Sequence, residues 1–117
     1  MAHILIAEDD ISTGRFIAAA LERAGHNVTL THDGLSALKT LETPENFNLL
    51  LTDIVMPGID GIELSRRAVK MRPNLKIMYI TGFSAMEAAT GRERPVLAKP
   101  FHLGDLVAQV ETLLQPA

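Results

Sequence analysis

The sequence predicts an α/β domain built on a parallel sheet. Short apolar segments alternate with amphipathic stretches along the 117 residues, which is the pattern of strands joined by helical crossovers. One segment, Leu49–Thr52, is apolar or nearly so without alternation, as expected of a strand covered by helices on both faces. It runs into a single acid, Asp53, which would lie at the carboxyl end of a central strand. Open α/β sheets place their ligands at that edge.

Five segments have the length and apolar character of strands. They are Ile4–Ala7, Val28–Thr31, Asn48–Thr52, Lys76–Ile80 and Val96–Ala98. Their spacing along the chain does not by itself give their order in the sheet.

Four stretches carry apolar residues at helical spacing, and these residues are expected to face the core. The expected stripes are Phe16, Ile17, Ala20, Leu21 and Ala24; Leu35, Leu38 and Leu41; Ile62, Ala68 and Val69; and Leu106, Val107, Val110, Leu113 and Leu114. Either Asp10 or Ser12 can cap the first helix, which Gly25 would close, and Asp33 would cap the second, which Pro44 would stop. Asp60 and Glu63 have the spacing of a capping box at the third.

Length and composition indicate one domain, residues 1–117, with no output domain. The hydrophobic content of 47% is ordinary for a globular protein, and 117 residues suit one core. Neither a signal peptide nor a membrane-spanning run is expected. The lack of cysteine excludes a thiolate metal site and fits the cytoplasm, and the net charge of −3 gives no electrostatic reason to expect nucleic acid binding.

Polar side chains of chemical interest follow four of the strands. They are Glu8, Asp9 and Asp10 after the first, Asp53 after the third, Thr81 after the fourth and Lys99 after the fifth. They should converge, because the carboxyl ends of parallel strands share one edge. Clustered carboxylates repel, and Mg²⁺ would relieve that repulsion. Since Lys99 and Thr81 can contact phosphoryl oxygens, the set predicts a phosphoryl-transfer site with Asp53 as the nucleophile.

Four motifs in this order resemble those of the receiver domains of bacterial two-component response regulators. They are LIAEDD (Leu5–Asp10), LLLTDIVMPGIDG (Leu49–Gly61), ITG (Ile80–Gly82) and AKPF (Ala98–Phe101). The resemblance covers nearly the whole chain. It implies a flavodoxin-like (CheY-like) sheet of five parallel strands in the order 2-1-3-4-5, with helices on both faces. It also implies Mg²⁺ as cofactor, a histidine kinase or histidine phosphotransfer protein as partner, and no enzymatic activity beyond the domain's own phosphorylation and dephosphorylation.

The resemblance further implies a role for each residue at the sheet edge. Asp53 would accept the phosphoryl group, which Thr81 and Lys99 would then contact, and the Lys99–Pro100 peptide bond would be cis. The metal ligands would be Glu8, Asp9, Asp53 and the backbone carbonyl of Val55. Asp10 is interpreted as a solvated or capping residue rather than a ligand.

Two features depart from the pattern of the family. Many receivers carry an aromatic residue three positions before the lysine, and here that residue is Val96. Phe83 or Phe101 would have to take its place at the switch or partner face. The segment 82–95 is short for a receiver, so the fourth helix, expected at Ser84–Ala89, should be cut down.

The sequence is compatible with more than one downstream role for the domain. TDIVMPGIDGIEL (Thr52–Leu64) and KPFHLGDLV (Lys99–Val107) resemble a stand-alone receiver that is a phosphorylation-controlled adaptor for an ATP-dependent protease, whose unfoldase would then be a partner. A phosphate sink or a shuttle in a phosphorelay is the alternative. A small aspartyl phosphohydrolase is disfavoured because such enzymes want a second acid where Val55 stands. A flavin site is disfavoured because the acids after the first strand would repel a phosphate.

The remaining polar side chains suggest no second site. Arg66, Arg67 and Lys70 are interpreted as a solvated helix face. The histidines have no ligand spacing and are interpreted as surface or capping residues: His3, His26, His32 and His102.

Overall fold

The computed structural model describes residues 2–82 and 94–115. Strands and helices alternate along the chain as β1 (His3–Ala7), α1 (Ile11–Arg23), β2 (Asn27–Thr31), α2 (Gly34–Leu41), β3 (Leu49–Asp53), α3 (Gly61–Met71), β4 (Lys76–Thr81), β5 (Val96–Ala98) and α5 (Leu103–Leu114). All the strands pair in parallel, in the order β2-β1-β3-β4-β5. The predicted fold class is therefore confirmed, strand order included. The short fourth helix predicted at Ser84–Ala89 lies outside the described residues.

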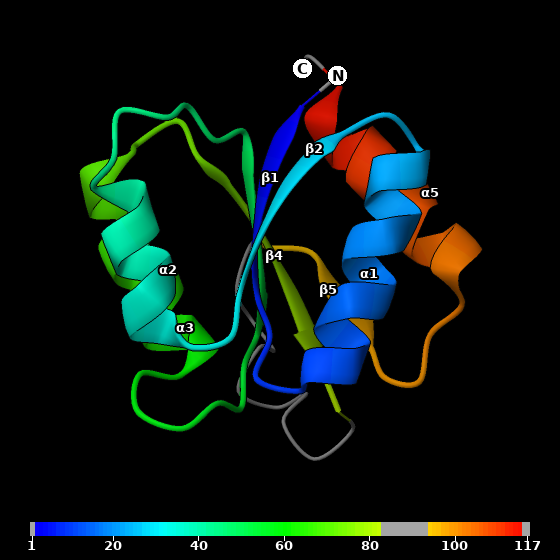
Figure 1. Ribbon diagram of the computed structural model, residues 1–117, viewed down its shortest axis with the longest axis horizontal. Helices are drawn as coiled ribbons and strands as arrows, with labels where there is room; N and C mark the ends of the chain where they lie inside the picture. The colour runs from blue at the N-terminus through cyan, green and yellow to red at the C-terminus, as the bar shows by residue number, and fades with distance from the viewer. Residues whose placement is uncertain (1, 83–93, 116–117) are drawn as a thin grey trace.

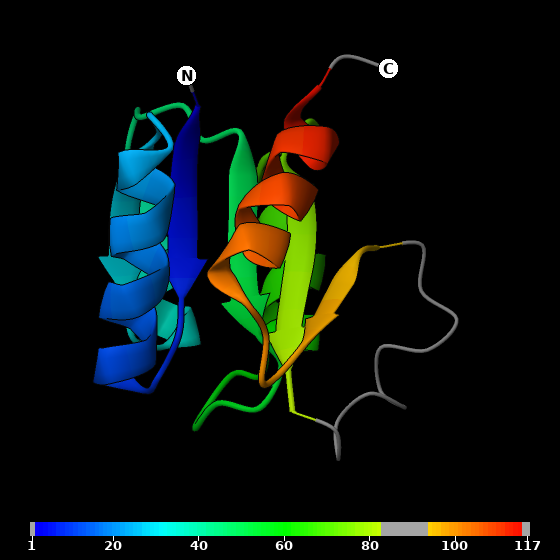
Figure 2. The ribbon, with the colours of Figure 1, turned by 90° about the vertical axis from the view of Figure 1, so that its right-hand side faces the viewer.

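Helices cover both faces of the sheet, with α2 and α3 on one side and α1 and α5 on the other (Figure 1). Each side has its own hydrophobic core, one centred on residues such as Leu50, Leu64 and Tyr79 and the other on residues such as Leu51 and Ile17. Every residue of β3 is buried, as its unbroken apolar sequence predicted. The strand ends point to a common edge of the sheet (Figure 2).

Aspartates cap α1, α2 and α3, the helices that follow β1, β2 and β3. Asp10 accepts a hydrogen bond from the N–H of Thr13, so Asp10 rather than Ser12 caps α1. Asp33 and Asp60 accept from the third residue of α2 and α3 in the same way. Only half of the expected capping box is formed at Asp60, because the Glu63 carboxylate pairs with two arginines of its own helix instead. Gly25 closes α1 with a φ of 100°, a conformation that glycine adopts without strain.

Two of the predicted buried stripes are rotated around their helices. Phe16 on α1 is 61% exposed and Leu35 on α2 is 57% exposed, although both were predicted to face the core. The two stripes were misplaced because glycines, Gly14 on α1 and Gly34 on α2, make the closest approaches of these helices to neighbouring segments. A Cβ on Gly14 would touch Leu30, and one on Gly34 would touch Ile59. A stripe defined by large apolar residues alone misses these positions. Ala24, also predicted to be buried, is exposed at the C-cap of α1.

The surface assignment of the histidines was wrong for His26. Its imidazole is buried, with Nε2 2.8 Å from a carboxylate oxygen of Glu111 on α5. Its Nδ1 accepts from the backbone N–H of Ala2 at 3.3 Å, so the ring joins the start of β1 to α5. His102, in contrast, is exposed at the N-cap of α5, where its side chain makes no capping hydrogen bond.

Candidate functional site at the carboxyl edge of the sheet

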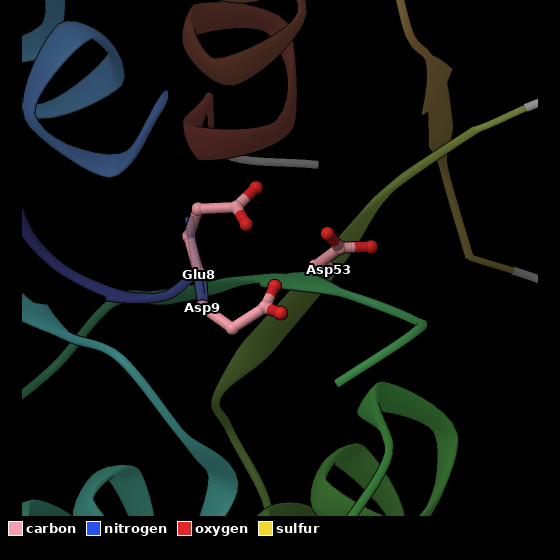
Figure 3. Close-up of side chains that lie close together, drawn as sticks. All are labelled: Glu8, Asp9 and Asp53. Atoms are coloured by element: carbon pink, nitrogen blue, oxygen red, sulfur yellow. The ribbon is translucent and has the colours of Figure 1, made fainter. Parts of the chain in front are cut away.

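Three acids gather where β1 and β3 end. Glu8 and Asp9 follow the last residue of β1, and Asp53 is the last residue of β3. One carboxylate oxygen from each lies within 4.8 Å of the others, and Figure 3 shows the three side chains turned toward one another. Glu8 and Asp53 are buried, whereas Asp9 is exposed. The convergence predicted from the parallel topology is thus present, with one acid open to solvent.

Lys99, the residue after β5, contacts two of these acids. Its Nζ lies 2.8 Å from Asp53 Oδ2 and 2.8 Å from Glu8 Oε1. Burial lowers the pKa of the Lys99 ammonium, but hydrogen bonds to Asp53 and Glu8 and the charges of both carboxylates raise it by more, so the net shift is upward. Lys99 therefore stays protonated at neutral pH and remains the positive centre of the site.

Glu8 is the most constrained of the acids. Its Oε2 accepts from the N–H of Asp10 at 3.0 Å while Oε1 accepts from Lys99. Burial raises the pKa of the Glu8 carboxyl above its ordinary value of 4.5, and the charge of Asp53 adds to this. The hydrogen bonds from Lys99 and Asp10 act in the opposite direction without cancelling the rise. The three carboxylates face a single ammonium, so excess negative charge is held in this cluster at a cost in free energy, which a divalent cation would relieve.

The backbone around Asp53 is fixed by its neighbours. The Thr52 hydroxyl donates to the Asp53 carbonyl at 2.8 Å, and the N–H of Val55 donates to Asp53 Oδ1 at 3.2 Å. The following turn passes through Gly58, which has a φ of 76°. With Oδ1 held by Val55 and Oδ2 by Lys99, the Asp53 carboxylate has one orientation.

Thr81 is the last residue of β4, the strand that pairs with the one ending in Asp53. Asp53 pairs in the sheet register with Ile80, so Thr81 is one residue further on along the neighbouring strand. Its side chain is fully buried, and its hydroxyl has no hydrogen-bond partner among the described residues. A buried hydroxyl without a partner is unfavourable in itself. It suits a site that receives a hydrogen-bond acceptor, such as a phosphoryl oxygen.

The remaining residues that were singled out from the sequence lie around this centre. The Lys99–Pro100 peptide bond is cis. Val96 packs against the core beneath α2 and α3 and is paired in register with Tyr79, whereas Phe101 packs against the opposite core, beneath α1 and α5. Phe83 lies outside the described residues. Asp10 caps α1 and is not a member of the acid cluster.

The donor set fits a hard cation. The three carboxylates that converge offer oxygen ligands, which Mg²⁺ and Ca²⁺ prefer, and no cysteine is present in the sequence. One acid is exposed, so solvent has access to the cluster. Mg²⁺ commonly retains several waters, and such a half-open cluster can accommodate them.

The chain matches a known protein family over most of its length. The model of the response regulator receiver domain matches residues 4–111. The chain belongs to this family. Among curated relatives of this receiver domain, the response regulator receiver protein CpdR of Brucella abortus is 52% identical over 118 residues, covering 97% of this chain and 98% of that protein. The DNA-binding transcriptional regulator NtrC of Azospirillum brasilense is 34% identical, but the receiver spans only 24% of it. The receiver spans about half of several other relatives.

Solved structures agree with the family assignment. The crystal structure of a response regulator receiver protein from Sinorhizobium medicae matches the receiver with a TM-score of 0.87 and 32% identity. The match covers 97% of this chain and 94% of that one. Among the described residues, no helix of the receiver has the length and apolar character needed to cross a bilayer.

Some polar contacts of the receiver were not foreseen from the sequence. The Tyr79 hydroxyl lies 2.6 Å from the Ser65 hydroxyl in the core, and His32 Nδ1 lies 3.0 Å from the Glu8 carbonyl oxygen. The only sequence signal for the first was a tyrosine within the predicted strand Lys76–Ile80 and a serine three residues from both Ile62 and Ala68, which were predicted to face the core. The contact between His32 and Glu8 had no sequence signal, because it depends on the conformation of the turn that joins β2 to α2.

Proposed function

We propose that this receiver accepts a phosphoryl group on Asp53 in a cytoplasmic two-component phosphorelay and thereby changes its affinity for a protein partner. One observation carries the proposal. The buried Asp53 carboxylate is oriented by the Lys99 ammonium at 2.8 Å, next to a strand end whose buried hydroxyl, that of Thr81, lacks a partner. A structural ion pair alone would explain Lys99, but it would not explain why an unsatisfied hydroxyl is kept beside it.

The proposed donor is a phosphohistidine of a histidine kinase or a histidine phosphotransfer protein. An oxygen of Asp53 attacks the phosphorus, a new O–P bond forms, and the P–N bond breaks with its electron pair going to the imidazole nitrogen. Lys99 stabilises the negative charge on the phosphoryl oxygens, and the Thr81 hydroxyl donates a hydrogen bond to one of them. Loss of the group by attack of water would reset the receiver.

Bound Mg²⁺ would supply positive charge that offsets the acids and the phosphoryl oxygens. Its proposed ligands are the carboxylates of Glu8, Asp9 and Asp53 and the backbone carbonyl of Val55. The convergence of the three carboxylates and the raised pKa of Glu8 support a cation at this place. Lys99 contacts one oxygen each of Glu8 and Asp53, so Asp9 is the acid of the cluster that Lys99 does not engage.

Phosphorylation of Asp53 is tested by intact-mass analysis after incubation with Mg²⁺ and acetyl phosphate. The wild type should gain the mass of one phosphoryl group, and Asp53→Asn should gain none. Asp105→Asn, which removes an exposed acid in the first turn of α5, is the matched control and should behave as the wild type. Absence of modification in the wild type, or equal modification of Asp53→Asn, would refute the proposal.

The finer proposal concerns the output. The resemblance of two segments to an adaptor receiver, and the 52% identity to CpdR, support the unfoldase of an ATP-dependent protease as the partner. A pull-down that compares the unmodified receiver with its beryllofluoride complex separates this role from a phosphate sink or shuttle. An adaptor should capture the unfoldase in only one of the two states. Identical sets of captured proteins would favour the sink or shuttle.

A further inference from the structure

We infer that His32 is a positioning residue for the metal site, because its imidazole fixes the peptide group that carries Asp9. The inference rests on the proposed function, since it concerns the affinity of the acid cluster for Mg²⁺. His32 itself touches neither the carboxylates of the cluster nor the group to be transferred. It acts through the backbone between Glu8 and Asp9.

Asp9 is the acid of the cluster that hydrogen bonds anchor least. It lies after the last residue of β1 and before the first residue of α1, and it is exposed. Glu8 is anchored through both carboxylate oxygens and through its N–H, which donates to the carbonyl of Thr31 at 3.0 Å. The Asp9 side chain has no hydrogen bond within the described part of the chain. Its direction therefore depends on the backbone before it.

The contact from His32 fixes that backbone. His32 Nδ1 lies 3.0 Å from the Glu8 carbonyl oxygen. Since a carbonyl only accepts, Nδ1 must carry the hydrogen. The carbonyl of Glu8 and the Cα of Asp9 belong to the same planar peptide group. Holding the carbonyl therefore limits rotation of the plane from which the Asp9 side chain starts.

The imidazole is itself held on a rigid support. Thr31, just before it, ends β2, and its hydroxyl donates to the carbonyl of Ile6 on β1 at 2.7 Å. Asp33, just after it, caps α2 through the N–H of Ser36 at 2.7 Å. Both neighbours of His32 are thus tied to separate elements. The turn between β2 and α2 presents the imidazole to β1 at a fixed position, which is what a positioning contact requires.

The test is calorimetric titration of Mg²⁺ into metal-free receiver, carried out for the wild type and three variants. His32→Ala should weaken Mg²⁺ binding about fivefold, the factor that corresponds to one neutral hydrogen bond. His32→Asn should restore most of the affinity, because the asparagine amide N–H can take the place of Nδ1–H. His102→Ala removes an exposed histidine that makes no side-chain capping bond, and should leave the affinity unchanged. If His32→Ala fails to fold, His32→Gln replaces it, since the longer side chain moves the N–H away from the carbonyl.

A second readout is amide hydrogen exchange in the metal-free state. Exchange should speed up in His32→Ala at Asp10, whose N–H donates to the Glu8 carboxylate, and should return to the wild-type rate in His32→Asn. Equal Mg²⁺ affinity of His32→Ala and the wild type would overturn the inference and leave the proposed function standing. So would an equal loss in His32→Ala and His32→Asn, because it would mean that the hydrogen bond is not the cause. A wild type that binds no Mg²⁺ would refute the cofactor part of the proposed function, and this inference with it.

Discussion

Gly61, the first residue of α3, lies directly against the backbone carbonyl of Asp53. Its N–H donates to the carbonyl of Ile54 at 2.8 Å, and a Cβ added to it would overlap the carbonyl carbon and oxygen of Asp53. The segment that leaves β3 therefore returns to the strand end at the start of α3. Only a residue without a side chain permits that return, so the geometry of the candidate site depends on a position with no chemistry of its own.

We predict that Gly61→Ala destabilises the receiver by about 3 kcal/mol, the upper end of typical overpacking costs, because backbone atoms would have to move. Chemical denaturation measures the effect. Gly104→Ala is the matched control, because a Cβ on Gly104 would meet no atom within 4 Å. It should stabilise the protein by up to about 1 kcal/mol through its helix propensity. Equal stability of the two variants would contradict the close approach.

Thr81 should show a conflict between stability and function. Thr81→Val replaces a buried hydroxyl that has no partner among the described residues with a methyl group, so it should stabilise the unmodified receiver by about 1 kcal/mol. The same change should weaken binding of beryllofluoride, which mimics the phosphoryl group, because one donor is lost. Thr81→Ser keeps the hydroxyl and should retain this binding despite the loss of a methyl group. A less stable Thr81→Val with unchanged beryllofluoride binding would argue that the hydroxyl is only structural.

Glu8 should make the metal-free receiver less stable as the pH rises. Burial raises the pKa of Glu8 in the folded state above its ordinary value of 4.5, so the folded protein binds this proton more tightly than the unfolded chain. The contribution of this proton to the free energy of unfolding is complete below pH 4.5, and it is lost as the pH passes through the raised pKa of Glu8. Glu8→Gln cannot lose a proton, so its stability relative to the wild type should increase from acid to neutral pH.

Denaturation of Glu8→Gln and the wild type between about pH 4 and pH 8, in the presence of a chelator, measures this difference in stability. Glu22→Gln, at an exposed position of α1, removes an equal charge and is the control. Parallel stability profiles of Glu8→Gln and the wild type would contradict the prediction.

The parts of the structure that follow from one-dimensional pattern were predictable. A continuous apolar strand ending in Asp53, and polar residues after its neighbours, lead to the sheet edge because parallel strands share it. The aspartate caps followed from the preference of short acceptors for the start of a helix. The order of the strands came from the family resemblance rather than from the spacing.

The parts that depend on close packing were not predictable from pattern. Phe16 and Leu35 were placed inward because large apolar residues define a stripe, yet Gly14 and Gly34 make the closest approaches to neighbouring segments. His26 was assigned to the surface because nothing local shows that Glu111 lies opposite it, 85 positions later in the sequence. Contacts of this kind arise only when elements distant in sequence are brought together.

Ser65 and Tyr79 form a buried polar pair that links α3 to β4. Their hydroxyl oxygens are 2.6 Å apart, and both side chains are almost entirely excluded from solvent. The Ser65 hydroxyl also donates to the carbonyl of Ile62 at 2.8 Å. Because that bond uses the only hydrogen on the serine oxygen, the tyrosine O–H must be the donor of the pair.

This direction predicts unequal costs for removing the two partners. Tyr79→Phe leaves the serine hydrogen satisfied by Ile62 and should cost about 1 kcal/mol, whereas Ser65→Ala leaves the buried tyrosine O–H without an acceptor and should cost about 2 kcal/mol or more. The double variant should be more stable than Ser65→Ala alone, because it removes the orphaned donor. Urea denaturation of the four proteins, analysed as a double-mutant cycle, measures each term. A larger cost for Tyr79→Phe than for Ser65→Ala would mean that the serine donates to the tyrosine and that the assigned direction is wrong.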